Sequence, residues 1–200
     1  MPLRPAMFKR RALNLSIALL VMIGVWQTGQ GAYIHAKAQL AQYLLHSAWQ
    51  RTLAGAKQVK PWPWADTWPV ARLTSPQHGV DLIVLAGASG RTLAFGPGHM
   101  TGTPLPGQRG NSVLSAHRDT HFAFLQHAKA GDEIILQTAD GAQQIYRLAI
   151  ATVVDKHDTR VILNTPDARL TLVTCYPFNS ITPGGPLRYV VTAERALSHS

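Results

Sequence analysis

The chain has 200 residues, a formal net charge of +9 and a single cysteine. This length allows one compact domain plus an additional segment, and it excludes two large domains. The hydrophobic content of 46% excludes an intrinsically disordered chain. One cysteine excludes an intrachain disulfide framework and a zinc site built from several cysteines.

The positive charge is concentrated near the N-terminus, which argues against nucleic-acid binding. Residues 1–65 contain eight Lys and Arg and no Asp or Glu, whereas residues 66–200 contain eleven basic and ten acidic residues. The longer part of the chain is therefore almost neutral and lacks the basic surface that phosphate binding requires. We expect no nucleic-acid partner.

The N-terminal charge accompanies an apolar segment. Lys9-Arg10-Arg11 precedes residues 12–34, a run of 23 residues without a formal charge. About 20 apolar residues cross a bilayer as a helix, because lipid leaves the backbone groups no other partner. Since basic residues that flank a span stay in the cytoplasm, we expect a cytoplasmic tail over 1–11, a signal anchor over 12–34 and an extracytoplasmic domain.

Two alternatives to an uncleaved anchor stay open. A cleavable signal peptide has the same basic start and apolar core, and Ala36-Lys37-Ala38 is its candidate cleavage site. That site lies late and contains a lysine, which favours the anchor. The length of the run and its basic flank disfavour a buried helix of a soluble protein. The anchor and the signal peptide both place the domain outside the cytoplasm.

Residues 35–60 are expected to form a membrane-proximal helix and a linker. Leu40, Tyr43, Leu44 and Ala48 have helical spacing, which predicts that the helix continues to about residue 55. The prolines that follow break a helix and favour extended chain. The domain boundary is therefore placed near residue 60, with a folded domain over 61–200.

Tryptophan is concentrated at the start of this domain. Trp62, Trp64 and Trp68 alternate with prolines over residues 61–69. Three positions stay open for them: at the membrane surface, in a substrate groove, or packed onto the domain. Packing is the commonest environment of a tryptophan side chain and is the favoured alternative.

The domain is expected to be mainly β, because short apolar segments alternate with turn residues. Ala139-Asp140-Gly141 is a strong hairpin signal. One short helix is expected over 122–128, capped by Asp119 or Thr120. Closely spaced strands and turns in this length predict a closed antiparallel barrel or a sandwich. The predicted strands are Val70–Leu73, Asp81–Ala86, Thr92–Phe95, Ser112–Ala116, Glu133–Thr138, Gln144–Val154, Leu170–Cys175 and Leu187–Ala193.

The single cysteine, Cys175, ends the strand Leu170-Thr171-Leu172-Val173-Thr174-Cys175 and precedes Tyr176-Pro177. A proline cannot continue a central strand, so Cys175 lies at or near the strand end. A free cysteine is usually a small buried core residue. Outside the cytoplasm, however, an unpaired thiol is exposed to oxidation, so it must be either buried or functional.

Two residues are candidate partners of a nucleophilic thiolate. A cysteine nucleophile needs a proton donor for the leaving group, and His117 follows the apolar strand 112–116. Arg188 begins the last strand, and a Pro/Gly-rich turn separates it from Cys175. If these two strands pair antiparallel, the guanidinium returns close to the thiol and can stabilise an oxyanion.

A metal site is not expected. His117 and His121 have the spacing of a helical metal-ligand pair, but Arg118 stands where a glutamate follows the first histidine in such motifs. A cation beside a metal is unfavourable, and the sequence offers no third ligand. The acidic residues are also too dispersed for a calcium site. We expect no cofactor.

Together these elements resemble the sortase family of membrane-anchored cysteine transpeptidases. Thr171-Leu172-Val173-Thr174-Cys175 is similar to the family motif TLxTC, and the order His117, Cys175, Arg188 agrees. The strings His117-Arg118-Asp119-Thr120-His121-Phe122 and Cys175-Tyr176-Pro177-Phe178, then Gly184-Gly185-Pro186-Leu187-Arg188-Tyr189, resemble the proteobacterial subgroup. The resemblance implies a closed eight-stranded β-barrel behind a transmembrane helix. For that subgroup it also implies a single-pass protein of the inner membrane with a periplasmic domain.

The resemblance also implies a mechanism and a substrate. The Cys175 thiolate attacks a peptide bond in the C-terminal sorting signal of a protein substrate, and His117 protonates the departing amine. Arg188 holds the oxyanion or the substrate backbone, with the backbone N–H of Tyr176 as a second donor. An amine or water then resolves the thioester. Residues 155–167 are expected to form part of the substrate groove.

Two alternatives to this function stay open. Other cysteine acyl-transferases, such as L,D-transpeptidase-like enzymes that act on peptidoglycan, carry a glycine directly before the nucleophile, whereas this chain has Thr174. A non-enzymatic β domain that binds a partner would contain a buried and inert Cys175. A thiol probe distinguishes this non-enzymatic alternative from an enzyme, because an inert Cys175 reacts only after the protein is unfolded.

Overall fold

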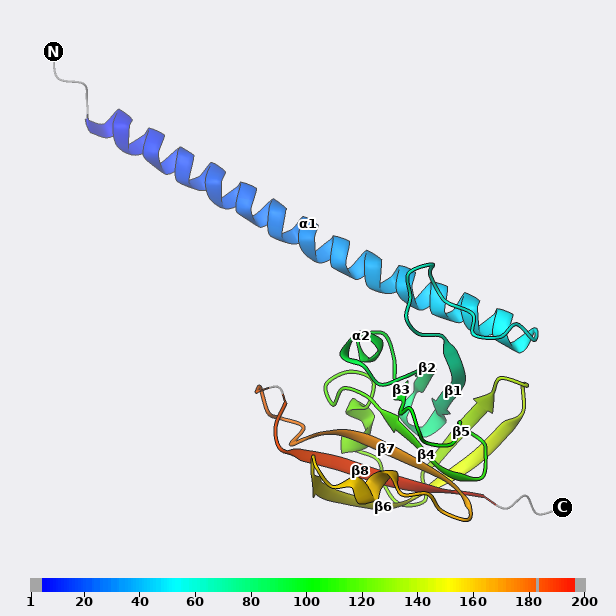
Figure 1. Cartoon of the computed structure of the whole chain (residues 1–200). Coiled ribbons are helices and arrows are strands. Elements are labelled where there is room, and N and C mark those ends of the chain that lie inside the picture. Colours follow the sequence, from blue (N-terminus) through cyan, green and yellow to red (C-terminus); the bar gives the residue numbers. More distant parts are fainter. Residues whose placement is uncertain (1–4, 183, 197–200) are drawn as a thin grey trace. The chain divides into compact units, whose positions relative to one another are not determined.

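The computed structural model describes residues 5–182 and 184–196, so part of the tail predicted over 1–11 lies outside the described residues. One helix, α1 (Pro5–Leu53), precedes eight strands (Figure 1). The strands are β1 (Pro69–Ser75), β2 (Val80–Ala86), β3 (Gly98–His99), β4 (Gly110–Ser115), β5 (Glu133–Thr138), β6 (Gln143–Asp155), β7 (Ala168–Tyr176) and β8 (Leu187–Arg195). The short helices are α2 (Gly90–Leu93), η1 (Pro76–His78), η2 (Ala123–Gln126) and η3 (Thr159–Ile162).

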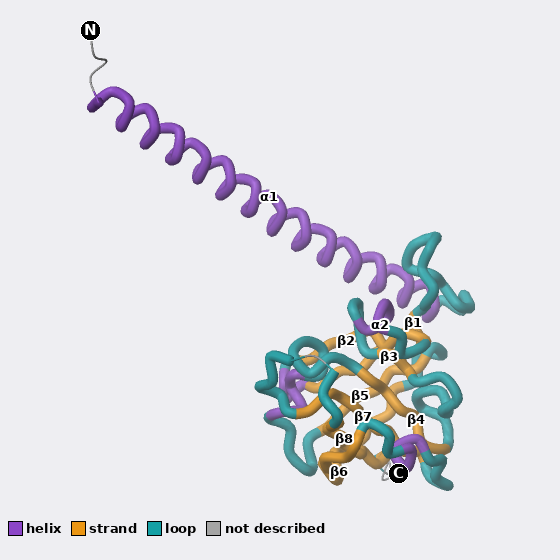
Figure 2. The backbone as a smooth tube through the Cα atoms, turned by 60° about the vertical axis from the view of Figure 1, so that its left-hand side comes forward, coloured by secondary structure: helices purple, strands orange, loops and turns teal. Residues whose placement is uncertain are grey.

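The eight strands close into a barrel in the order β1-β2-β3-β4-β7-β8-β6-β5. Figure 2 shows the strands grouped into one body with loops and short helices in the connections. The closed eight-stranded barrel is therefore confirmed, but the predicted antiparallel arrangement is incomplete. The pairs β2–β3 and β4–β7 are parallel, and the remaining pairs are antiparallel.

One predicted strand was wrong, and one predicted short helix is present with narrower bounds and without its predicted cap. The segment 92–95 is not a strand, because the Ser89 hydroxyl accepts the N–H of Thr92 and starts helix α2. The short helix after His117 is limited to η2, and its first flanking residue, Phe122, makes no side-chain cap. Neither Asp119 nor Thr120 therefore caps it. The eighth strand is instead β3, whose two residues are too few to produce a sequence pattern.

The β5–β6 hairpin was predicted correctly. Gly141 has a φ of 86°, a left-handed conformation that glycine adopts without strain. Its N–H donates to Thr138 O at 2.9 Å, and Thr138 N–H donates to Ala142 O at 2.9 Å. The turn thus fixes the register in which Gln137 faces Gln143.

The barrel interior is filled by alternate residues of the strands. Leu170 and Leu172 of β7 lie with Leu114 of β4 and Val191 of β8 in one buried cluster. Because side chains alternate across a strand, Thr171, Val173 and Cys175 of β7 lie on the other face. The outer face of β4, β7 and β8 is therefore the face that carries Cys175.

The contacts of the chain divide it into two units, residues 1–42 and 43–200. In the second unit, the last turns of α1 pack on the barrel, where Leu45 and Trp49 form a buried cluster with Ile83 and Leu85. The predicted domain boundary near residue 60 lies after the end of this helix and stays a prediction.

The described residues of the first unit belong to α1 and include its apolar part. From Leu13 onward the helix is long and apolar enough to cross a membrane, and its apolar window is not buried. Trp26 and Tyr33 are exposed within it. This exposure is not the pattern of a core helix, and the continuous helix agrees with the prediction that residues 35–55 extend the apolar segment.

The tryptophan-rich segment packs only in part. The Trp62 ring contacts Phe95 edge-on, with 4.9 Å between ring centroids. The backbone of Trp68 accepts the N–H of Ala86, whereas Trp64 is 83% exposed. Packing onto the domain therefore describes Trp62 but not Trp64.

A hydrogen-bonded carboxylate directly before β5 makes the stability of the fold depend on pH. Asp132 accepts hydrogen bonds from the Lys129 N–H at 2.9 Å and from His78 Nε2 at 2.8 Å. These bonds hold the pKa of Asp132 below its ordinary value of 3.8, and the bond from the Lys129 backbone has the larger effect. A carboxyl with a depressed pKa stabilises the fold above about pH 4, and this contribution disappears as the pH falls through the folded pKa.

We predict that Asp132→Asn lowers the free energy of unfolding by roughly 1 kcal/mol at pH 6. The difference between wild type and variant should shrink steadily below about pH 4, because the wild-type carboxyl is then protonated too. Urea unfolding of both proteins between pH 2.5 and 6 measures this. A difference that does not change with pH would contradict the assignment.

Candidate active site

Two of the predicted site residues lie on adjacent strands, and the third follows the end of a third strand. In the β7–β8 ladder Cys175 is the direct partner of Arg188. In the parallel β4–β7 ladder Ser115 is the partner of Val173, and Ala116 N–H donates to Val173 O at 3.2 Å. Ser115 ends β4, so His117 lies two residues beyond the paired part of this strand. Continued in the same register, the chain would place His117 beside Cys175 and give a row of site residues in the order His117, Cys175, Arg188.

The residues before Cys175 explain why β7 has this register. Leu170 and Leu172 are fully buried in the barrel core. Thr174 is also buried, and its hydroxyl donates to Ala116 O at 2.7 Å. This bond ties the end of β7 to the residue directly before His117. The leucines and Thr174 thus anchor the strand while Cys175 remains half-buried on the outer face.

The side chain of Arg188, the ladder partner of Cys175, is held by backbone carbonyls. Its Nη1 donates to Gly185 O at 2.8 Å and to Leu187 O at 2.9 Å, so the guanidinium is fixed by the connection that precedes β8. Among the described residues, no carboxylate forms an ion pair with it. Its positive charge is therefore available to a developing oxyanion.

A groove of about 460 Å³ lies on the same face as Cys175. Val154 lines this groove and is the β-ladder partner of Arg188, so the groove begins next to the row of site residues. Its apolar floor is formed by Val154 and Val190, which pack in one cluster with the buried Val113 and Val173. The groove is lined by Asn111, Thr152, Val154, Asp158, Arg160, Val161, Leu163, Thr165, Arg169, Thr171, Val190 and Thr192.

One buried asparagine holds the wall of this groove. Asn111 Nδ2 donates to Val161 O at 2.9 Å and to Leu163 O at 3.1 Å. Its Oδ1 accepts the Thr171 hydroxyl at 2.6 Å, and its backbone N–H donates to Asn164 Oδ1 at 3.0 Å. A single side chain thus joins β4 and β7 to the connection between β6 and β7.

The glycine before Asn111 permits this close approach. Gly110 has a φ of 106°, and a Cβ atom at this position would collide with Asn164 Oδ1. The predicted groove segment 155–167 is therefore packed directly against the start of β4 and does not extend freely from the barrel.

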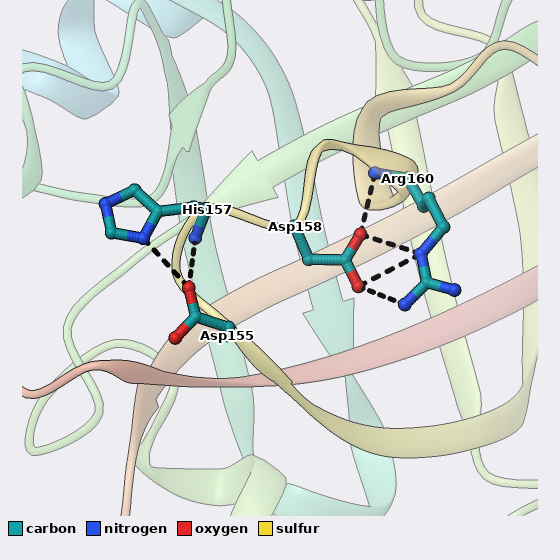
Figure 3. Close-up of polar contacts among 4 residues, drawn as sticks. All are labelled: Asp155, His157, Asp158 and Arg160. Atoms are coloured by element: carbon teal, nitrogen blue, oxygen red, sulfur yellow. Dashed lines mark hydrogen bonds and ion pairs between the residues drawn. The ribbon is translucent and has the colours of Figure 1, made fainter.

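Acidic caps shape the turn that begins this wall (Figure 3). Asp155 Oδ1 accepts the backbone N–H and the ring Nδ1 of His157, both at 2.9 Å. Asp158 accepts the Arg160 side chain, with Nη2 at 2.6 Å, and the Arg160 backbone N–H at 3.0 Å. These bonds lower the pKa of Asp158 to about 2, so the carboxylate stays charged at neutral pH.

The segment after His117 contains a second histidine. His121 is partly buried, and this burial lowers its pKa below 6.5, assisted by the charge of His117 and opposed by Asp119. His121 therefore stays neutral at pH 7. In the part of the chain that the structure describes, no three His, Cys, Asp or Glu side chains form a group that could hold a metal ion.

Three residues of this region were not identified from the sequence. Asn111 and Thr171 were missed because their roles depend on contacts between distant segments. Arg118 was considered as a cation unfavourable to a metal and as a member of the subgroup string, and it was given no structural role. It is 8% exposed, and its Nη2 donates to Ser180 O at 2.6 Å and Thr182 O at 2.9 Å. The only sequence signal for it is its position next to His117.

Comparison with known families identifies the fold. The family model of the sortase domain matches residues 73–196. Sortase D of Bacillus subtilis is 34% identical over 124 residues, which is 62% of either protein. Sortase A of Listeria monocytogenes is 32% identical over 110 residues, 53% of this chain and 49% of that protein. The matches thus span about half to three fifths of these curated relatives.

Solved structures agree with this family. Sortase C-1 of Actinomyces oris is 32% identical, with a TM-score of 0.57 over 64% of this chain and 75% of that one. The Clostridium perfringens sortase D5 transpeptidase has a TM-score of 0.59 over 76% of this chain and 88% of that one. At 24% identity, this second likeness supports the fold alone.

We predict that Asn111→Ala releases the groove wall. The variant loses both side-chain bonds to Val161 O and Leu163 O and leaves the Thr171 hydroxyl without its acceptor. Leaving buried polar groups unpaired should cost about 1–3 kcal/mol in unfolding free energy. Hydrogen–deuterium exchange should become faster in residues 159–165 while the β5–β6 hairpin stays unchanged. If the substitution changes the exchange rates of residues 159–165 and of the hairpin by the same factor, Asn111 does not act specifically on the wall.

Proposed function

This chain belongs to the sortase family, and we propose that it is a membrane-anchored cysteine transpeptidase. In this proposal it cleaves a peptide bond in a sorting signal through a thioester on Cys175 and transfers the acyl group to an amine or to water. The observation that carries the proposal is the direct pairing of Cys175 on β7 with Arg188 on β8, with β4 pairing beside β7 and ending two residues before His117. In the proposed row a thiol and an imidazole lie beside a guanidinium that forms no ion pair with a carboxylate among the described residues.

In the first step the Cys175 thiolate attacks the carbonyl carbon of the scissile peptide bond. The carbonyl oxygen becomes an oxyanion, and the Arg188 guanidinium stabilises its charge. The backbone N–H of Tyr176 is the second proposed donor. When the C–N bond breaks, protonated His117 gives its proton to the departing amine, and a thioester to Cys175 remains.

In the second step an amine or a water molecule attacks the thioester carbonyl. His117, now neutral, takes a proton from this nucleophile, and the Cys175 thiolate leaves. An amine yields a new amide bond, whereas water yields a carboxylate. The acceptor therefore decides whether the enzyme joins two proteins or only cleaves one.

The groove supports a peptide substrate in extended conformation. Its lining extends along β7 and β8 from Val190, two residues beyond Arg188, to Arg169, and its floor is apolar. An extended chain presents alternate side chains to such a floor and keeps its backbone groups accessible. We propose that the residues before the scissile bond lie in this groove.

The apolar helix supports an anchored enzyme. Residues 12–34 carry no formal charge and follow Lys9-Arg10-Arg11. We propose that they cross the inner membrane once, with the N-terminus in the cytoplasm and the barrel in the periplasm. The enzyme would then meet its substrates on the outer side of that membrane. Membership of the proteobacterial subgroup is part of this proposal.

We predict that Cys175→Ala abolishes cleavage and that His117→Ala and Arg188→Ala each lower kcat by at least about 100-fold. The assay is cleavage of a peptide library by the full chain in detergent, which also identifies the sorting motif. An amine acceptor in a parallel reaction separates transpeptidation from hydrolysis.

A matched control is Arg147→Ala, because Arg147 pairs with Glu133 on β5 and lies outside the row and the groove. It should retain wild-type turnover. Undiminished cleavage by Cys175→Ala would overturn the mechanism. A Cys175 thiol that reacts with iodoacetamide only after unfolding would instead favour a non-enzymatic domain.

A further inference from the structure

Arg118 is a buried arginine that forms no ion pair with a carboxylate in the part of the chain that the structure describes. It is 8% exposed, and none of the ion pairs among the described residues includes it. Its Nη1 is buried and has no hydrogen-bond partner in the described chain. Burial of a charged group is unfavourable unless it is compensated, so the contacts that it does make should explain its position.

Those contacts are with the connection between β7 and β8, described for residues 177–182 and 184–186. Nη2 of Arg118 donates to Ser180 O at 2.6 Å and to Thr182 O at 2.9 Å. Both acceptors are backbone carbonyls, so the guanidinium holds the path of the chain and not a side chain. Hydrogen bonds from a cation are short and strong, which suits them to hold an otherwise exposed segment.

The backbone of Arg118 belongs to the turn that carries His117. The two residues are neighbours in the sequence, and His117 O accepts the Phe122 N–H at 3.0 Å, which closes the turn around Arg118. Phe122 is fully buried in the barrel core. The turn is therefore fixed on the core side by Phe122 and on the connection side by Arg118.

The held connection links the two other site residues. It begins after Tyr176, next to Cys175, and ends at Leu187, next to Arg188. Gly185 of the same connection accepts the Arg188 guanidinium at 2.8 Å. Two arginines thus hold the carbonyls of one connection, Arg118 in its middle and Arg188 at its end.

We propose that Arg118 is a positioning residue, which fixes the β7–β8 connection against the His117 turn and thereby keeps His117, Cys175 and Arg188 in register. It acts through these residues and does not touch the reacting atoms. Catalysis by positioned groups is steeply sensitive to small displacements, so release of the connection should slow turnover. The catalytic consequence rests on the proposed transpeptidase function, whereas the structural hold does not.

The test compares three full-length variants in detergent: Arg118→Met, Arg118→Lys and the control Arg147→Met. Methionine keeps an unbranched apolar side chain but removes every hydrogen-bond donor. Lysine keeps the positive charge and offers the N–H donors of one ammonium group. Arg147 is exposed and pairs with Glu133, so its substitution makes the same chemical change outside this region. Hydrogen–deuterium exchange reports the connection, and steady-state cleavage of the library-derived peptide reports kcat and KM.

We expect the amides of residues 178–182 to exchange at least about 10-fold faster in Arg118→Met, with β4, β7 and β8 still protected. In the same variant kcat should fall about 10-fold or more with a smaller change in KM. Arg118→Lys should recover part of both effects, and Arg147→Met should match the wild type.

Three results would overturn the proposal: unchanged exchange in residues 178–182, equally accelerated exchange across β4, β7 and β8, or faster local exchange with unchanged kcat. The second would assign Arg118 to general stability, and the third would separate the connection from catalysis. If the wild type cleaves no peptide, the proposed function fails, while the exchange data still decide whether Arg118 holds the connection.

Discussion

The parallel pairing of β4 with β7 is the constraint on which the rest of the site depends. These strands lie about 60 residues apart in the sequence, and their register is set by the β-ladder and by the buried Thr174 hydroxyl, which donates to Ala116 O. A slip by one residue would turn every side chain of β7 to the opposite face and move Cys175 into the core. Continued for two residues beyond β4, the same register would place His117 beside Cys175, as the proposed function requires. The antiparallel pairing with β8 then adds Arg188 on the other side.

The alternation of β7 divides structural from chemical roles. Its leucines and Thr174 face the barrel interior, and Cys175 shares the outer face with the groove floor. The flanking connections are held by side chains and not by regular pairing: Asn111 holds the groove wall, and Arg118 holds the segment between β7 and β8. A stable barrel thus supports two connections whose positions depend on a few polar contacts.

Much of the fold followed from local patterns, and the missing parts have physical reasons. Strand alternation and turn residues identified seven strands and the position of Cys175 at a strand end. They also failed locally, since a short segment such as 92–95 fits a strand or a helical turn, and the bonds from Thr92 N–H to Ser89 Oγ and from Leu93 N–H to Ser89 O form α2. The parallel ladders were not predicted, because pairing direction depends on the path of the whole chain. Arg118 and Asn111 were missed for the same reason: their acceptors lie more than 45 residues away. The resemblance of the residues around Cys175 supplied what periodicity could not.

The central claim is that Cys175 becomes acylated by a peptide. The most direct test mixes the full chain with a peptide that it cleaves and quenches the reaction in acid. Intact-mass spectrometry then measures the mass of the protein. The account predicts a mass increase equal to the N-terminal fragment of the peptide, located on Cys175 and removed by hydroxylamine. Efficient peptide cleavage with no adduct in the wild type, or an adduct that persists in Cys175→Ala, would contradict it.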